Sequence, residues 1–277
     1  MPLDRPRVMG ILNVTPDSFS DGGRFFSLDE AVARAETILG EGADIIDVGG
    51  ESTRPQGATP VDVSEERRRV LPVIDAIVQR FPKAIVSVDT VKSEVAEGAL
   101  AEGAAIVNDV SALRLDSRMV DVCARTRAGV VLMHSRGGVS DMGTFAHAQY
   151  GRDVVGEVLD ELAPSVAEAE RAGVQRDSIV LDPGIGFAKR TEHSLTVLAG
   201  LVRIVDAGFP VLVGVSRKRF IGEITSVRDP EQRLYGAIGA NVMALVAGAR
   251  IFRVHDVAAA RQSLDVAWAI LQREYDA

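Results

Sequence analysis

The chain has 277 residues, of which 47% are hydrophobic and 25% are charged, and its formal net charge is −8. This length suits one barrel of about 250 residues better than two average domains, and the acidic balance argues against a nucleic-acid partner, because phosphate backbones select basic surfaces. We expect a cytoplasmic protein with no membrane partner, because no apolar run of about 18 residues and no signal-peptide segment occurs, and because the single cysteine, Cys123, cannot form an intrachain disulfide and suits the core.

Eight apolar runs rich in β-branched residues follow one another along the chain, and each leads into a polar or ionisable residue. The runs end at Asn13, Asp47, Asp89, Asn108, Met133, Asp182, Val215 and Val254. These ends lie roughly 20 to 50 residues apart, which is the length of one crossover helix with its loops. We therefore predict an α/β fold, a (β/α)₈ TIM barrel with a single domain over residues 1–277, whose site lies at the carboxyl ends of the strands.

Helical patterns lie between the runs. Ser27 and Glu30 have the capping-box spacing ahead of a helix over about 28–41, and an apolar stripe predicts a helix over 64–81 with Ser64 as N-cap. Near the C-terminus, residues 232–248 are small and apolar nearly all round, which indicates two buried faces. One face is expected on the barrel and the other on a second subunit, so a homodimer is predicted.

Two features of the last helix and of the loops complete the pattern. Leu264, Trp268 and Leu271 recur at helical spacing, so Trp268 is interpreted as a core or subunit contact and not as a ligand platform. The loops after the first, second and fifth strands are long and rich in Gly and Ser, and such loops in a compact domain are usually functional. We expect them to act as lids over the site.

Cationic side chains follow or end several of the strands, namely Arg54, Arg217, Lys218, Arg253 and His255. Cationic loops after the seventh and eighth strands are the usual phosphate site of this fold. Arg253 and His255 alternate within one strand and so project to the same side, where together they suit a di- or triphosphate. Residues 217–219 are all cationic and cannot all point the same way. A solvated charged rim is the alternative for any one of these residues.

Three acids and amides, Asp89, Asn108 and Asp182, close other strands. They could form a metal site, a general acid–base pair or a recognition edge for a heterocycle. A flat ring rich in N–H donors fits best, because three oxygens are few for Mg²⁺ and carboxylates accept from such donors. Met133 and Phe187 lie beside this group and supply either its apolar faces or plain core. The DPGIGFAK segment after Asp182 carries glycines that allow a tight turn.

Eight motifs resemble those of one family: MGILNVTPDSFSDGG (9–23), DVGGESTRP (47–55), SVDT (87–90), VNDVS (107–111), LMH (132–134), LDPGIGFAK (181–189), GVSRKRFIG (214–222) and RVHDV (253–257). They are similar to dihydropteroate synthase motifs, in the same order. The resemblance implies condensation of 6-hydroxymethyl-7,8-dihydropterin diphosphate with 4-aminobenzoate, giving 7,8-dihydropteroate and diphosphate.

The resemblance also implies roles for individual residues. The pterin is held by Asp89, Asn108, Asp182 and Lys218; Mg²⁺ is bound by Asn13; and the phosphate oxygens are contacted by Arg253 and His255. The aminobenzoate slot is lined by Thr53, Pro55, Ser216 and Lys218, with Asp17, Phe19 and Arg54 on the loops that close over it. Gln56 departs from the family pattern by lengthening the strand-2 loop, and the wording of the strand-5 loop is also uncommon.

The chemistry implied is a dissociative substitution. Mg²⁺, Arg253 and His255 neutralise the leaving diphosphate, while Asp89 and Asp182 stabilise the cationic pterin fragment. Together with Lys218 these residues form the predicted catalytic set, and the arylamine needs no strong general base. Two alternatives remain: a methyltetrahydrofolate-binding corrinoid methyltransferase barrel, which does not need a diphosphate clamp, and a paralogue that binds pterin without catalysis.

Overall fold

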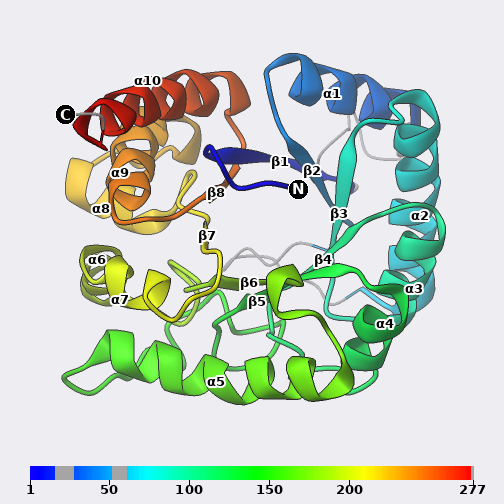
Figure 1. Ribbon diagram of the computed structural model, residues 1–277, viewed down its shortest axis with the longest axis horizontal. Coiled ribbons are helices and arrows are strands. Elements are labelled where there is room, and N and C mark those ends of the chain that lie inside the picture. Colours follow the sequence, from blue (N-terminus) through cyan, green and yellow to red (C-terminus); the bar gives the residue numbers. More distant parts are fainter. Residues whose placement is uncertain (16–27, 52–60, 276–277) are drawn as a thin grey trace.

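The computed structural model describes residues 1–15, 28–51 and 61–275. In these residues eight parallel strands form one sheet in the order β6-β5-β4-β3-β2-β1-β8-β7, and a bridge between Leu181 and Val211 joins its two edges. The predicted (β/α)₈ barrel is confirmed, with helices arranged in a ring around the strands (Figure 1). The strands are β1 (Arg7–Asn13), β2 (Ile45–Gly49), β3 (Ile85–Asp89), β4 (Ile106–Asp109), β5 (Gly129–Met133), β6 (Ile179–Asp182), β7 (Leu212–Val213) and β8 (Ile251–Val254).

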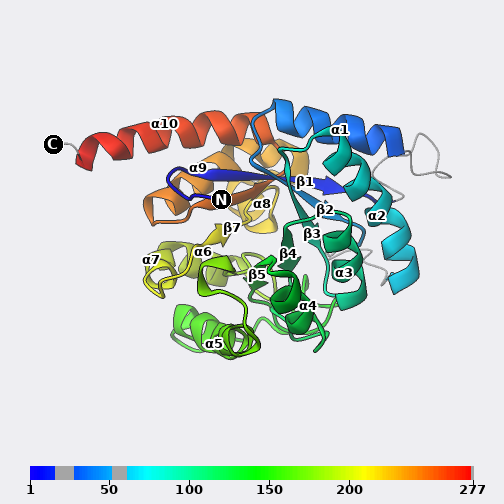
Figure 2. The same cartoon turned by 45° about the vertical axis from the view of Figure 1, so that its right-hand side comes forward.

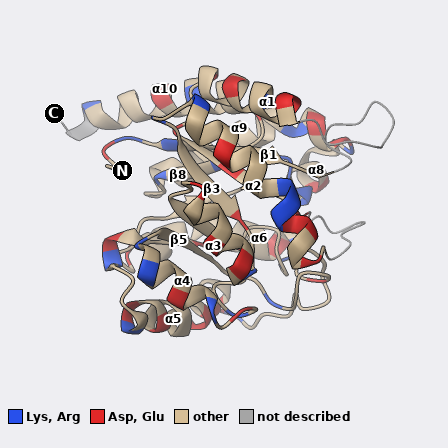
Figure 3. Ribbon diagram, turned by 90° about the vertical axis from the view of Figure 1, so that its right-hand side faces the viewer, with Lys and Arg blue, Asp and Glu red and all other residues tan. Residues whose placement is uncertain are grey.

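Helices connect successive strands and cover the outside of the barrel. They are α1 (Leu28–Gly40), α2 (Val63–Arg80), α3 (Ser93–Ala101), α4 (Met119–Thr126), α5 (Val154–Ala172), α6 (Thr191–Ala199), α7 (Leu201–Val205), α8 (Arg219–Thr225), α9 (Leu234–Val246) and α10 (Val257–Tyr275), with short 3₁₀ turns η2 (Arg176–Ser178) and η3 (Pro230–Arg233). In Figure 3 basic and acidic residues are interspersed along the helices of one side, as on an ordinary solvated surface. Among the described residues no helix is both long and apolar enough to cross a membrane.

The N-cap of α2 is Asp62, so the prediction of Ser64 is wrong. The Asp62 carboxylate accepts a hydrogen bond from the backbone N–H of Glu65 at 2.9 Å, and the Ser64 hydroxyl donates to the same carboxylate at 2.6 Å. An ionised side chain at a helix N-terminus is favoured by the helix dipole as well as by the hydrogen bond. The carboxylate therefore places the N-cap two residues earlier than the hydroxyl would, and α2 begins at Val63.

The interior of the barrel changes from apolar to polar along the strands. A buried cluster lies toward the amino ends and consists of Met9, Ile45, Val131, Leu212 and Ile251. Side chains alternate between the two faces of a strand, so residues two or four positions further on face the same interior. At those positions stand Asn13, Asp47, Met133, Ser216 and Arg253. The core therefore fills one end of the barrel, and polar side chains gather at the other.

The C-terminal helices α9 and α10 pack side by side, as both views show (Figures 1 and 2). Leu264 is fully buried, and Trp268 and Leu271 pack against the core while partly exposed, so the interpretation of this stripe as a core contact is confirmed. The outer side of α9 exposes Tyr235 and Met243, with exposed fractions of 84% and 68%. The helix predicted over 232–248 thus buries one face and leaves a second apolar face uncovered.

Candidate active site

Arg253 lies at the centre of the polar end of the barrel. Its Nε donates to Asp47 Oδ2 and its Nη2 donates to Asp89 Oδ2, both at 2.6 Å. Burial disfavours the charge of this guanidinium, but the two carboxylates outweigh burial and raise its pKa. These two bonds use two of the five N–H groups of the guanidinium. Arg253 therefore joins strands β8, β2 and β3 and has further donors to offer to an anion.

Asp47 belongs to this site, although the sequence analysis did not assign it a role. Its side chain is completely buried, and its Oδ2 also accepts a hydrogen bond from Asn108 Nδ2 at 3.0 Å. The other oxygen, Oδ1, is buried and has no hydrogen-bond partner in the described part of the chain. An unsatisfied buried acceptor is costly, about 1–3 kcal/mol. A ligand that supplies an N–H group here recovers that cost.

Asp89 and Asp182 are carboxylates at the ends of β3 and β6; Asp182 is buried, and the side chain of Asp89 is 12% exposed. Burial raises the pKa of Asp89 to about 7, against the opposing charge of Arg253. Burial likewise raises the pKa of Asp182 to about 6, and its Oδ1 accepts a hydrogen bond from the backbone N–H of Gly184 at 2.7 Å. Both groups therefore change protonation near neutral pH, which is typical of residues that bind or transform a ligand.

The glycine-rich turn after β6 approaches β5 more closely than any side chain would allow. Gly184 has a φ of +64°, and a Cβ on it would lie 1.9 Å from the carbonyl oxygen of His134. His134 in turn donates its backbone N–H to the carbonyl of Asp182 at 2.8 Å. The prediction that this segment needs glycine for a tight turn and a close backbone approach is confirmed.

Lys218 follows β7, the strand between those that carry Asp182 and Arg253. Its Nζ is 4.0 Å from the centre of the Phe187 ring, a cation–π contact. Burial, followed by the nearby charge of Arg253, lowers the pKa of Lys218 to about 8. Its neighbours turn elsewhere, as predicted for three adjacent cations: Arg217 pairs with Asp256 at 2.9 Å, and Arg219 stacks on Phe145.

Ser216 and His255 meet between β7 and β8. The Ser216 hydroxyl oxygen is 3.2 Å from the backbone N of His255, which donates to it, and 3.0 Å from His255 Nδ1. His255 follows Arg253 by two positions and lies at the same end of the barrel. The Ser216 hydroxyl therefore orients the imidazole ring of His255 at the polar end of the barrel.

An apolar patch borders the carboxylates. Met133 is buried in a small cluster with Val91, Val110 and Met142, and Phe187 packs against this cluster while partly exposed. Met133 is also the register partner of Asp182 in the sheet. A flat ring that is hydrogen-bonded to these carboxylates can therefore pack one face against the apolar patch.

The remaining predicted site residues are Asn13, at the end of β1, and several residues that lie outside the described part of the chain. Asn13 ends β1, is half-buried and is in register with Gly49. Thr53, Arg54, Pro55 and Gln56, together with Asp17 and Phe19, lie outside the described residues, as do the predicted strand-1 and strand-2 lids. In the strand-5 loop, Met142 is fully buried in the apolar patch, so this loop packs against the site.

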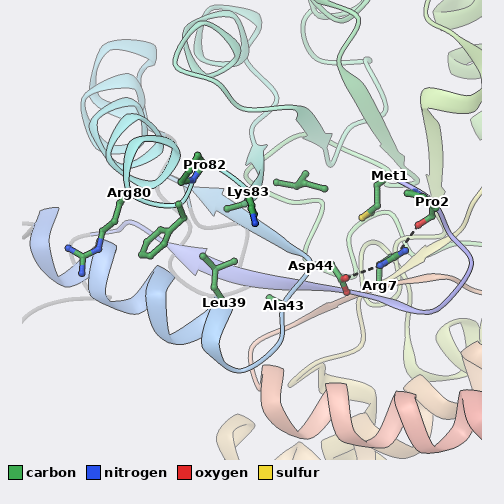
Figure 4. Close-up of a pocket in the computed structure, with 12 residues that line it drawn as sticks. Met1, Pro2, Arg7, Leu39, Ala43, Asp44, Arg80, Pro82 and Lys83 are labelled. Carbon is green, nitrogen blue, oxygen red and sulfur yellow. Dashed lines mark hydrogen bonds and ion pairs between the residues drawn. The ribbon is translucent and has the colours of Figure 1, made fainter.

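A hollow of about 670 Å³ lies at the other end of the barrel (Figure 4). It is lined by the start of β1, by Leu39, and by residues 80–85 between α2 and β3. Arg7 on its wall is bonded to Asp44 at 3.1 Å, and Arg80 pairs with Glu36 at 2.9 Å. Arg7, Asp44 and Arg80 on its wall are already paired with one another or with neighbours, so we place the site at the polar end and not in this hollow.

Comparisons with known proteins point to one family. A family model described as pterin binding enzyme matches residues 9–255. The dihydropteroate synthase of Synechocystis sp. is 46% identical over 266 residues, which is 96% of this chain and 90% of that protein. The Xanthomonas albilineans dihydropteroate synthase solved with 4-aminobenzoic acid has a TM-score of 0.89 and 48% identity, covering 98% of this chain and 94% of that one. The Yersinia pestis dihydropteroate synthase solved with a sulfonamide drug complex has a TM-score of 0.90 and 39% identity, with coverage of 98% and 96%.

Proposed function

The chain belongs to the dihydropteroate synthases, and from this premise we propose how its residues divide the work of the reaction. Enzymes of this family condense 6-hydroxymethyl-7,8-dihydropterin diphosphate with 4-aminobenzoate, giving 7,8-dihydropteroate and diphosphate. One observation carries the division of roles: Arg253 bridges Asp47 and Asp89 at the same end of the barrel where Lys218 and Asp182 lie. Hydrogen-bond acceptors for a heterocycle and hydrogen-bond donors for an anion thus lie at the same end of the barrel.

The pterin is recognised by the buried acceptors. Its amino and ring N–H groups donate to Asp89 and Asp182, and Asn108 supplies an amide that can both donate and accept. The orphaned Oδ1 of Asp47 is a further acceptor at the same depth. A ring without N–H donors leaves these carboxylates unpaired, at a cost of several kcal/mol, so the pocket discriminates by hydrogen bonding. Met133 supplies an apolar surface for the ring.

The diphosphate is bound by Arg253 and His255. The bond that breaks joins the methylene carbon of the pterin to a diphosphate oxygen, and the electron pair leaves with that oxygen. Both residues stabilise the negative charge that develops there. The carbon left behind is cationic, and the carboxylates of Asp89 and Asp182 stabilise it. The arylamine nitrogen then forms the new C–N bond and afterwards loses one proton.

Mg²⁺ fits this site as an ion that arrives with the diphosphate. Among the described residues no group of three His, Cys, Asp or Glu side chains could hold a metal on its own. Mg²⁺ keeps several waters and is often bound by one or two protein oxygens and substrate phosphates, so the amide oxygen of Asn13 suffices. When bound, the ion supplies positive charge to the leaving diphosphate oxygens.

The second substrate lies between Phe187, Lys218 and Ser216. Lys218 offers a cation to the carboxylate of 4-aminobenzoate, and the Phe187 ring packs beside it. Thr53, Arg54 and Pro55 complete this slot in the proposal. A sulfonamide drug that mimics aminobenzoate is expected to compete for the same place.

The assembly is a homodimer through α9 and α10. These helices expose Tyr235, Met243, Val246, Val266 and Ile270 on their outer sides, and large exposed apolar patches mark protein contacts. Sedimentation at micromolar concentration is expected to show a dimer, and Met243→Glu to shift it toward monomer. A monomeric wild type would contradict the proposal.

The protein works in the cytoplasm, where a buried free thiol such as Cys123 stays reduced.

Diphosphate release tests the whole assignment. We expect release only when both substrates and Mg²⁺ are present, and loss of release when a chelator removes the metal. Pterin binding without release would support the non-catalytic paralogue instead. Methyl transfer from methyltetrahydrofolate to a corrinoid, without diphosphate release, would support the other alternative, although the Arg253–His255 pair favours the synthase.

A further inference from the structure

A buried lysine, Lys189, lies directly behind the turn that follows β6. Its exposed fraction is 1%, and its Nζ lies 2.7 Å from His134 Nδ1 and 3.3 Å from the carbonyl oxygen of Phe187. Both contacts are with neutral acceptors, and burial lowers the pKa of this amine to about 7. Burying an amine in this way is expensive. None of the steps above uses it.

The contacts of Lys189 continue to the surface through a neutral histidine. His134 Nε2 is 3.0 Å from Glu161 Oε2, and Arg136 also donates to this carboxylate. Hydrogen bonding to His134 and then to Arg136 lowers the pKa of Glu161 to about 2, while burial and then the charge of Lys189 lower the pKa of His134 to about 4. At neutral pH the imidazole is therefore uncharged: Nε2–H donates to Glu161, and Nδ1 accepts from Lys189.

The turn that Lys189 contacts is strained and needs external support. Ala188, between Phe187 and Lys189, has a φ of 45°, a left-handed conformation that is costly for a residue with a side chain. Its backbone N–H donates to the carbonyl of Met142 at 2.7 Å, and the Lys189 amine binds the carbonyl of Phe187 on the other side. These two contacts hold the peptide from both directions.

We propose that Lys189, oriented by His134, is a positioning residue for the second substrate. It fixes the main chain of Phe187, and the Phe187 ring in turn fixes the ammonium group of Lys218 at 4.0 Å. This inference rests on the proposed function, because it concerns the aminobenzoate slot assigned to Phe187 and Lys218. It assigns to Lys189 no contact with either substrate.

Lys189→Met tests the inference, because methionine fills a similar volume without the amine. We expect the KM for 4-aminobenzoate to rise about tenfold, while kcat and the KM for the pterin diphosphate stay within about twofold. In a Phe187→Ala background the same substitution is expected to change the aminobenzoate KM by less than about twofold, because the two residues act in series. Lys83→Met, an exposed lysine at the opposite end of the barrel, is the matched control and leaves all three constants unchanged.

Glu161→Gln gives a second, independent variant at the accessible end of the chain of contacts. Its side chain is 40% exposed, so we expect the variant to fold, and weakening the bond to His134 is expected to raise the same KM about threefold. If Lys189→Met does not fold, the same double-mutant cycle is measured with Glu161→Gln, alone and combined with Phe187→Ala.

Two results would overturn the inference: equal changes in both KM values, or full additivity with Phe187→Ala. A wild type that releases no diphosphate in response to aminobenzoate would instead overturn the proposed function. The two failures are therefore distinguishable.

Discussion

The two ends of the barrel are built from the same strands and differ in almost every physical property. At the amino ends, Met9, Ile45 and Ile251 pack in a dry cluster. Two to four residues further along, the same faces carry carboxylates, an amide and a guanidinium in buried ion pairs. The first end contributes stability by burying apolar surface, whereas the second holds charges whose desolvation opposes folding. We infer that the polar end is maintained for its chemistry and the apolar end for the fold.

The largest effect is expected from Arg253→Met at the polar end. It leaves Asp47 and Asp89 buried without their guanidinium, and breaking a buried ion pair in this way costs about 3–5 kcal/mol. Diphosphate release is expected to fall at least about a thousandfold. Urea denaturation and steady-state kinetics measure the two losses. Adding Asp47→Asn is expected to restore part of the stability and none of the activity, and restored activity would contradict the role of Arg253.

A substitution at the apolar end should separate stability from activity. Ile45→Ala removes a fully buried side chain two positions before Asp47, and is expected to cost about 2–5 kcal/mol of unfolding free energy. Below the unfolding transition, kcat/KM should stay within about twofold of wild type. Ile45→Val is the conservative control, with an expected loss of about 0.5–1.5 kcal/mol. A selective loss of kcat in either variant would mean that the two ends are coupled.

Asp89→Asn probes what a carboxylate does beyond binding. We expect kcat to fall about a hundredfold, while the dissociation constant of the pterin diphosphate changes less than about fivefold, because charge stabilises the cationic fragment and not the ground state. Single-turnover kinetics and calorimetric titration measure the two quantities. A change confined to KM would rule out stabilisation of the cation.

A change of pH is the mildest perturbation of the polar end, because it alters only the protonation of the wild-type side chains. The pKa values of Asp89 and Asp182 are raised to about 7 and about 6, so both take up protons as the pH falls through this range. Ionised carboxylates accept the pterin N–H groups, so kcat/KM for the pterin should fall about tenfold between pH 7 and pH 6 and by up to about a hundredfold per pH unit below that, because both groups must be ionised. Above about pH 8, Lys218 loses its charge, and kcat/KM for aminobenzoate should decline. A flat profile from 5 to 7 would contradict the roles of both acids.

Much of the fold and part of the site could be predicted, because period-two alternation and strand ends are local signals. Asp89, Asn108 and Asp182 close their runs, so the sequence alone places them at one edge. Asp47 has no role in the sequence analysis because Val48 and Gly49 extend its strand beyond it, although its spacing from Ile45 already indicates the barrel interior.

Burial of Lys189 had no comparable signal. A lysine in a glycine-rich loop normally lies in solvent, and its contact with His134 joins positions 55 residues apart. The N-cap of α2 was assigned wrongly for a related reason: a hydroxyl and a carboxylate two residues apart both suit that position, and only their three-dimensional contacts decide between them.

The close approach at Gly184 has a consequence for the design of inhibitors. No other amino acid can occupy that position without displacing the backbone of β5, and with it the carbonyl of Asp182 that is bonded to His134. A compound that makes its essential contacts to the main chain of this turn meets a surface that single substitutions cannot reshape without damaging the enzyme itself. Such a compound offers less opportunity for resistance than one that depends on exchangeable side chains.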